Sequence, residues 1–216
     1  MSIQKRFTPQ DLERIKAAVK GAESKISGEV VPVFVEKSGY YSIANYRGAM
    51  MAAALTFLVV IVLDRYFPSV AVYDPMLIFT LVLIGGLVGA LMAHYILPLK
   101  RWLLSQSHLD QSTKKRAENA FLEEEVFNTS QRTGIMIFVS FFEREVIVMA
   151  DKGISKVVDQ KEWDKMVWGI IESIRKGKIV DGLEVAIKQC GDLLLEKGFI
   201  ISPDDINELS DDLRFE

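Results

Sequence analysis

The chain has 216 residues, with 26 Lys or Arg against 29 Asp or Glu, so its net charge at pH 7 is only −3. The basic residues are dispersed among acidic ones, which argues against a nucleic-acid-binding surface. A single cysteine and two histidines exclude an intrachain disulfide and a multi-thiolate metal site, and they argue against a metal site built on histidine. The composition leaves an ordinary folded domain, interrupted by two long apolar runs.

The first 42 residues predict a helix followed by a strand. Thr8 is the expected N-cap, Pro9 occupies the first helical position, and Asp11 reaches back as in a capping box. Apolar residues then recur at a helical spacing up to residue 26, which predicts a helix ending near residues 27–28. The segment EVVPVFV reads as a strand, and Pro32, which lacks a backbone donor, predicts an edge position or a local break.

The two apolar runs, residues 48–63 and 76–97, predict a transmembrane hairpin within residues 43–99. About 20 apolar residues are needed to cross roughly 30 Å of hydrocarbon. The second run meets this length without a formal charge, and the first reaches it if residues 43–47 form its first turns with Arg47 snorkelling. The spans are expected at about 45–63 and 76–97, because the segment between them is too short for a domain.

The charges that flank this hairpin predict its orientation. Five basic residues or basic groups lie at its outer ends, namely Lys37, Arg47, Lys100, Arg101 and residues 114–116. The connecting segment offers only Arg65, beside Asp64 and Asp74. By the positive-inside rule both termini should face the cytoplasm.

Small residues indicate how the two spans pack. Gly85 and Gly89 form a G-x-x-x-G motif extended by Ala93, and Ala49 and Ala53 provide a small-residue face on the first span. Packing within the hairpin is favoured over a homodimer, because the partner face is already tethered nearby.

After the hairpin the sequence returns to a mixed α/β pattern. A helix is expected at about 110–127, then strands in RTGIMIFVSF and EVIVMA joined by a turn at 142–144, and then a helix that begins at Asp159. The last long helix should run from about 181 to 197, with Cys190 on its buried stripe and Gly198 just past its end.

These elements predict one α/β domain, a small mixed sheet covered by helices, that the hairpin interrupts. Residues 1–42 and 100–200 would form its two parts, with residues 201–216 as an acidic tail that is loosely docked or mobile. The first strand should pair with residues 135–140 or 146–149, because neither half alone supplies enough strands for a stable sheet.

Four segments carry a family resemblance: GEVVPVFV, RTGIMIFVSFFEREVIVMADKGI, the Asp159 helix start and IRKGKIVDGLEVAIKQCGDLL. They resemble the TPM domain family, and the chain is similar to bacterial membrane members in which a transmembrane hairpin interrupts the domain. The resemblance implies an α/β/α sandwich. For some members it also implies weak acid phosphatase activity, divalent-metal binding, or a role in assembling and repairing membrane complexes. Other members tend to carry an acidic residue where this chain has Ser155.

Three carboxylates are candidate ligands for a divalent cation, Ca²⁺ or Mg²⁺: Glu143, Asp151 and Asp159. Turn and strand-end positions can converge at one sheet edge and supply the oxygen ligands that such cations prefer. The alternative is structural, since Glu143 can hold a turn and Asp159 can cap a helix. No P-loop and no G-x-S-x-G motif occurs, so the sequence nominates no catalytic residue.

The sequence therefore predicts a multi-pass protein of the bacterial inner membrane, in contact with the lipid bilayer and with another membrane protein or complex. Its cytoplasmic domain would be a docking or assembly and repair module, with no nucleic-acid partner. The alternative is a weak divalent-metal-assisted acid phosphatase on the same scaffold. Convergence of the three carboxylates would favour the enzyme, and their dispersal would favour the module.

Overall fold

The computed structural model describes residues 3–201 and 207–215, and the chain divides into two compact units. One unit, here called the sheet domain, joins the residues up to Ser38 to those from Asp110 onward. The other, here called the hairpin unit, comprises Gly39–Leu109. The start of the expected acidic tail, residues 202–206, lies outside the described residues.

The sheet domain is built on a mixed sheet in the order β3-β2-β1-β4. Its strands are β1 (Glu29–Val35), β2 (Gly134–Ser140), β3 (Glu145–Ala150) and β4 (Arg214–Phe215). β1 runs parallel to β2 with Val33 opposite Phe138, and β3 runs antiparallel to β2. The prediction that the first strand pairs with residues 135–140 is confirmed, although the whole hairpin unit separates the two strands in sequence.

Two expectations about this sheet need correction. β1 is not an edge strand, because β4 pairs with Val33 and Phe34 on its other side. The described part of the tail is not loosely docked either, since it supplies β4 and buries Leu213. The physical reason is apolar contact: Leu213 and Phe215 pack against the core on one face of the sheet, and Leu209 packs against the core on the other.

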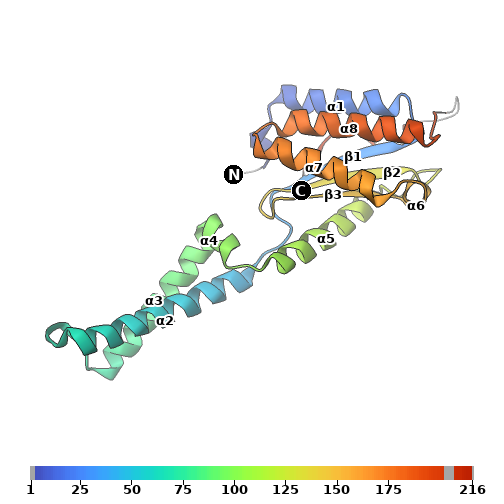
Figure 1. Ribbon diagram of the computed structural model, residues 1–216. Helices are drawn as coiled ribbons and strands as arrows, with labels where there is room; N and C mark the ends of the chain where they lie inside the picture. Colours follow the sequence, from blue (N-terminus) through green and yellow to red (C-terminus); the bar gives the residue numbers. More distant parts are fainter. Residues whose placement is uncertain (1–2, 202–206, 216) are drawn as a thin grey trace. The chain divides into compact units, whose positions relative to one another are not determined.

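Helices cover both faces of the sheet, which gives the α/β/α sandwich that the resemblance implies (Figure 1). The helices on one face are α1 (Pro9–Glu23), α7 (Gln160–Arg175) and α8 (Ile179–Glu196), and the opposite face carries α5 (Gln106–Glu123). Successive strand residues alternate between the two cores, as a strand requires. Phe34 and Ile137 face α1, α7 and α8, whereas Val33 and Phe138 face α5.

The ends of the helices follow the predicted capping residues. At α1 the Asp11 N–H donates to Thr8 Oγ1 (3.2 Å), and the Thr8 N–H donates to Asp11 Oδ2 (2.9 Å), so the predicted capping box is confirmed. α1 ends at Glu23, before the predicted end, because the Ser27 N–H bonds to Phe199 O and Ile26 forms a β-bridge with Ile200. Gly198 has a φ of +88°, as expected just past the end of α8.

The hairpin unit contains two helices that are long and apolar enough to cross a membrane: α2 (Ser42–Tyr66) and α3 (Pro75–Tyr95). A short 3-10 turn, Pro68–Val70, lies between them. Residues 43–47 do form the first turns of α2, as predicted. α3 ends before residue 97, because Pro98 has no N–H and would clash with a helical carbonyl one turn earlier. The chain continues in the short helix α4 (Leu97–Trp102).

Candidate functional site

Asp151, one of the three predicted metal ligands, lies just after β3 and already forms hydrogen bonds with other groups of the protein. Its side chain is 4% exposed, and its two oxygens accept hydrogen bonds from Arg132 Nε (2.6 Å) and Nη2 (3.0 Å). Asp151 Oδ1 also accepts from the Lys152 N–H, which caps the short helix α6 (Lys152–Ser155). Its backbone N–H donates to Gly134 O, so Asp151 fastens the start of β2 to the end of β3.

Glu143 has a structural environment of its own, in the turn between β2 and β3. It is fully buried, and its carboxylate accepts from the Ser38 N–H (2.8 Å) and from Ser140 Oγ. The Ser38 and Ser140 hydroxyls also share a hydrogen bond. Glu143 therefore ties the segment after β1 to the hairpin turn.

The three predicted ligands are not brought together. Ser140 pairs with Glu145 at one end of the β2–β3 ladder and Ile135 pairs with Ala150 at the other, so Glu143 and Asp151 lie at opposite ends. A strand of six residues, such as β3, is about 20 Å long. Asp159 is exposed and caps α7 by accepting from the Lys161 N–H (3.2 Å). Among residues 3–201 and 207–215, no three His, Cys, Asp or Glu side chains form a group that could hold a metal ion.

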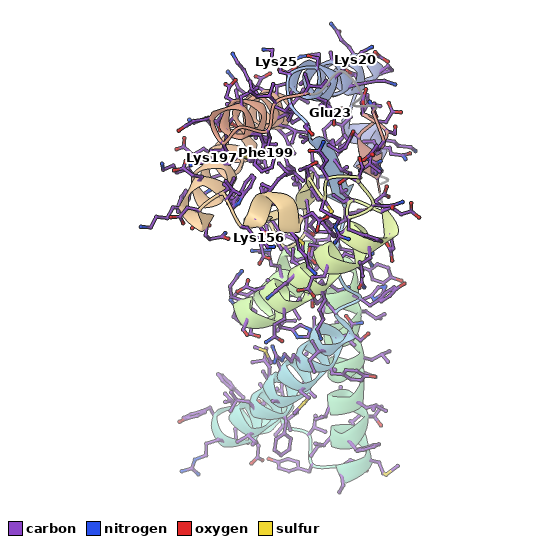
Figure 2. The ribbon with its side chains drawn as sticks, turned by 90° about the vertical axis from the view of Figure 1, so that its right-hand side faces the viewer. Lys20, Glu23, Lys25, Lys156, Lys197 and Phe199 are labelled. Carbon is purple, nitrogen blue, oxygen red and sulfur yellow. The ribbon has the colours of Figure 1, made fainter. Side chains whose placement is uncertain are left out.

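The structure instead reveals two neighbouring carboxylates, Glu29 buried and Glu23 half-buried, that we did not predict from the sequence. Glu23 ends α1 and Glu29 opens β1, and both line a cavity of about 200 Å³. Glu23 accepts from the Val30 N–H (2.8 Å), and Glu29 Oε1 accepts from the Glu208 N–H (3.0 Å). In the described part of the chain, Oε2 of each glutamate is buried without a hydrogen-bond partner. Figure 2 shows Glu23 between α1 and the sheet, and Lys20, from the preceding turn of α1, lines the same cavity.

The electrostatics of this pair reflect its burial. Burial raises the pKa of Glu23 to about 9, opposed by the Val30 hydrogen bond and reinforced by repulsion from Glu29 and Asp211. Burial also raises the pKa of Glu29, with repulsion from Glu208 and Asp211 adding to the shift. The arrangement can hold a positive charge, which would favour the ionised form of both groups.

A third acidic region lies near the start of β3. Burial raises the pKa of Glu145 to about 7, and a hydrogen bond shared with Asp110 acts in the same direction. Thr113, fully buried on α5, opposes the shift through its own hydrogen bond to Glu145. Glu145 therefore changes its charge close to physiological pH.

The small residues predicted for helix packing line the seam between α2 and α3. A methyl group on Gly48 would lie 2.7 Å from both Gly89 O and the Ala93 side chain, so the backbones are in close contact. A methyl group on Gly85 would collide with Thr56, and one on Gly86 would lie 3.5 Å from Ala53 Cβ and from Ala49 O. Both helices therefore use small side chains where they meet.

Comparisons with known proteins gave a family match for part of the chain and a solved structure with a similar fold. Residues 102–193 match the family model of the TPM domain, so the predicted resemblance to that family is confirmed over this part of the chain. The match begins after the hairpin helices and does not include β1, which the structure adds to the same sheet.

A solved structure shares the fold. It is the NMR structure of the BA42 protein from the psychrophilic bacterium Bizionia argentinensis, with a TM-score of 0.59 and 18% identity over 97% of this chain and 95% of that one. At this identity the likeness concerns the fold alone. The search of curated proteins gave no match.

The glutamate pair was missed although the sequence carries a signal for it. Ile15, Val19 and Glu23 follow one another at intervals of four residues, so Glu23 falls on the buried stripe of α1. Glu29 is the only charged residue of an otherwise apolar strand, EVVPVFV. A carboxylate at a buried position of a helix or strand marks a group that needs a partner.

Proposed function

We propose that the chain is a multi-pass inner-membrane protein whose TPM domain works in the cytoplasm as a docking or assembly module. The observation that carries this proposal is the distribution of side chains in the hairpin unit. Its small residues face the seam, and its large apolar side chains face outward, among them Leu55, Phe57, Phe79 and Leu87. Such a surface is suited to lipid rather than to water.

The orientation follows from the flanking charges. Basic residues cluster beside the ends of α2 and α3 that connect to the sheet domain, whereas Arg65 in the connecting segment is accompanied by Asp64 and Asp74. Reporter fusions at residue 216 and near Val70 should therefore report opposite compartments, with residue 216 cytoplasmic. A periplasmic residue 216 would contradict the proposed topology.

Docking is favoured over hydrolysis because the candidate ligands serve the fold. Asp151 pairs with Arg132, Glu143 holds the β2–β3 turn, and Asp159 caps α7. The sheet domain also leaves Trp168 on α7 63% exposed. Tryptophan is among the residue types that contribute most to protein interfaces.

A photo-crosslinking experiment in membranes tests whether the TPM domain docks on another membrane protein. A photoreactive phenylalanine analogue at position 168 should join the chain to a distinct membrane protein, and the same analogue at exposed position 161 of α7 should not. Trp168→Ala should reduce co-purification of that protein about tenfold, with Lys161→Ala as the matched control. Equal crosslinking at both positions would contradict a docking role for this face.

The enzymatic alternative gives a different result. The purified full chain would hydrolyse an aryl phosphate in a Mg²⁺- or Ca²⁺-dependent manner, and Asp151→Asn or Glu143→Gln would abolish the activity. That outcome would replace the docking module with the phosphatase.

A further inference from the structure

The junction between α1 and β1 places two incompletely bonded carboxylates beside one cavity. Glu29 is 8% exposed, and Glu23 reaches the same cavity from the last residue of α1. Glu23 accepts the Val30 N–H and lies beside Asp211, and Glu29 accepts backbone N–H groups of the Glu208–Leu209 segment. The second oxygen of each, Oε2, is buried without a partner among the described residues. Buried polar atoms of this kind are rare, and a bound water or ion is one explanation for them.

The cavity has the size and lining of an ion site. Its volume of about 200 Å³ exceeds that of one cation and accommodates several water molecules, each of which occupies about 30 Å³. Ser24 and Asn207 also line the cavity; the Ser24 hydroxyl donates to Gly21 O, and the Asn207 amide donates to Asp211 Oδ1. Lys20 lines the cavity as well, but in the described structure no ion pair joins it to either glutamate.

We propose that this cavity binds one hard divalent cation through Glu23 and Glu29, with Mg²⁺ as the preferred ion. Because each carboxylate has one oxygen committed to a backbone N–H, each offers a single oxygen to the ion. Mg²⁺ is commonly held by one or two carboxylates while it retains several waters, whereas Ca²⁺ takes six to eight oxygens and often binds carboxylates through both. Water in the cavity would have to complete the coordination, because no group of three His, Cys, Asp or Glu side chains lies together among the described residues.

An ion at this position would join three parts of the sheet domain. Glu23 belongs to α1, Glu29 belongs to β1, and the Glu208 N–H that bonds Glu29 belongs to the segment leading to β4. Occupancy would therefore stabilise the attachment of the C-terminal segment to the sheet. The site does not use Asp151, Glu143 or Asp159 as ligands, and the inference does not depend on the proposed docking role.

Metal binding can be measured on the full chain in nonionic detergent micelles. Mn²⁺ serves as a paramagnetic substitute for Mg²⁺, and the loss of its free-ion electron paramagnetic resonance signal counts bound ions. We expect one bound Mn²⁺ per chain, displaced by Mg²⁺, and at least a tenfold weaker affinity in Glu29→Gln and in Glu23→Gln. Glutamine keeps an oxygen that can accept the backbone N–H, so both variants should fold, which circular dichroism checks.

The matched control is Glu196→Gln, which removes an exposed carboxylate at the end of α8 and should bind as the unmodified chain does. A second readout is the increase in unfolding temperature on adding Mg²⁺, which the unmodified chain and the control should show and the two site variants should lose. If one site variant unfolds, the other decides the question. Equal Mn²⁺ binding in all chains, or none in the unmodified chain, would overturn the proposal.

Discussion

The two units of this chain arrange their side chains in opposite ways. In the hairpin unit Gly48 and Gly89 lie at the contact between helices, and Phe57 and Leu58 are exposed. In the sheet domain Phe34 and Phe138 are fully buried. The difference teaches that apolar composition alone does not decide what is inside: in water large apolar residues are buried, whereas in lipid close backbone contact drives helix packing.

The units also differ in how they treat charge. α2 and α3 carry few ionisable groups, whereas the sheet domain buries Glu29, Glu143 and Asp151. Each buried carboxylate is bound by backbone N–H groups, a hydroxyl or Arg132. In the sheet domain, buried carboxylates therefore link strands and turns through hydrogen bonds. In the hairpin unit, the two helices are held by close packing of small residues.

The sharpest test of the comparison makes the same substitution in both units. Phe34→Ala in β1 should destabilise the sheet domain by about 3–5 kcal/mol, because Phe34 packs against the rings of Phe7, Phe141 and Phe215. Phe57→Ala on α2, half exposed, should change the stability of its unit far less. Thermal unfolding in micelles measures both, and similar losses would show that Phe57 is also a packing residue.

The close contact between α2 and α3 can be disrupted by a substitution that adds a large side chain. Gly48→Leu should separate α2 from α3 and cost about 3 kcal/mol, because its side chain would meet Gly89 O and Ala93. A disulfide reports the separation: position 86 would carry a Cβ 3.5 Å from that of Ala53, within disulfide range.

The disulfide experiment has a direct control. Ala53→Cys with Gly86→Cys should oxidise rapidly in the parent and poorly with Gly48→Leu, and Cys190 is buried and does not compete. Gly169→Leu on α7, where a methyl group meets nothing within 4 Å, should leave oxidation unchanged. Undiminished crosslinking with Gly48→Leu would contradict the close seam.

The fold could be predicted where local patterns determine it. The capping residues Thr8 and Asp159 placed the starts of α1 and α7, and the length of the two apolar runs placed α2 and α3. β4 could not be predicted, because two residues carry no strand pattern and their pairing with Val33 and Phe34 depends on distant packing. The scatter of Glu143, Asp151 and Asp159 likewise depends on the register of β2 with β3, which no single segment specifies.

Within the sheet domain, two aspartates predicted as equivalent ligands should behave differently. Asp151→Asn removes the charge that binds Arg132 through two hydrogen bonds and should cost about 1–2 kcal/mol. Asp159→Asn should cost almost nothing, because asparagine caps a helix as well as aspartate does. Denaturant unfolding compares them, and equal losses would argue against the structural assignment of Asp151.

The smallest expected effect is a pH dependence from Glu145, beside Asp110, Thr113 and Glu143. Burial raises its pKa from 4.5 to about 7, so between these values the folded chain binds more protons at this site than the unfolded chain. This group's contribution to stability therefore falls as pH rises from about 4.5 to 7 and is constant above.

Glu145→Gln, which cannot ionise, should flatten that part of the unfolding-temperature profile and raise the unfolding temperature at pH 8 relative to the parent. Glu118→Gln, an exposed change on α5, is the control; an unchanged slope in Glu145→Gln would show that another group titrates there.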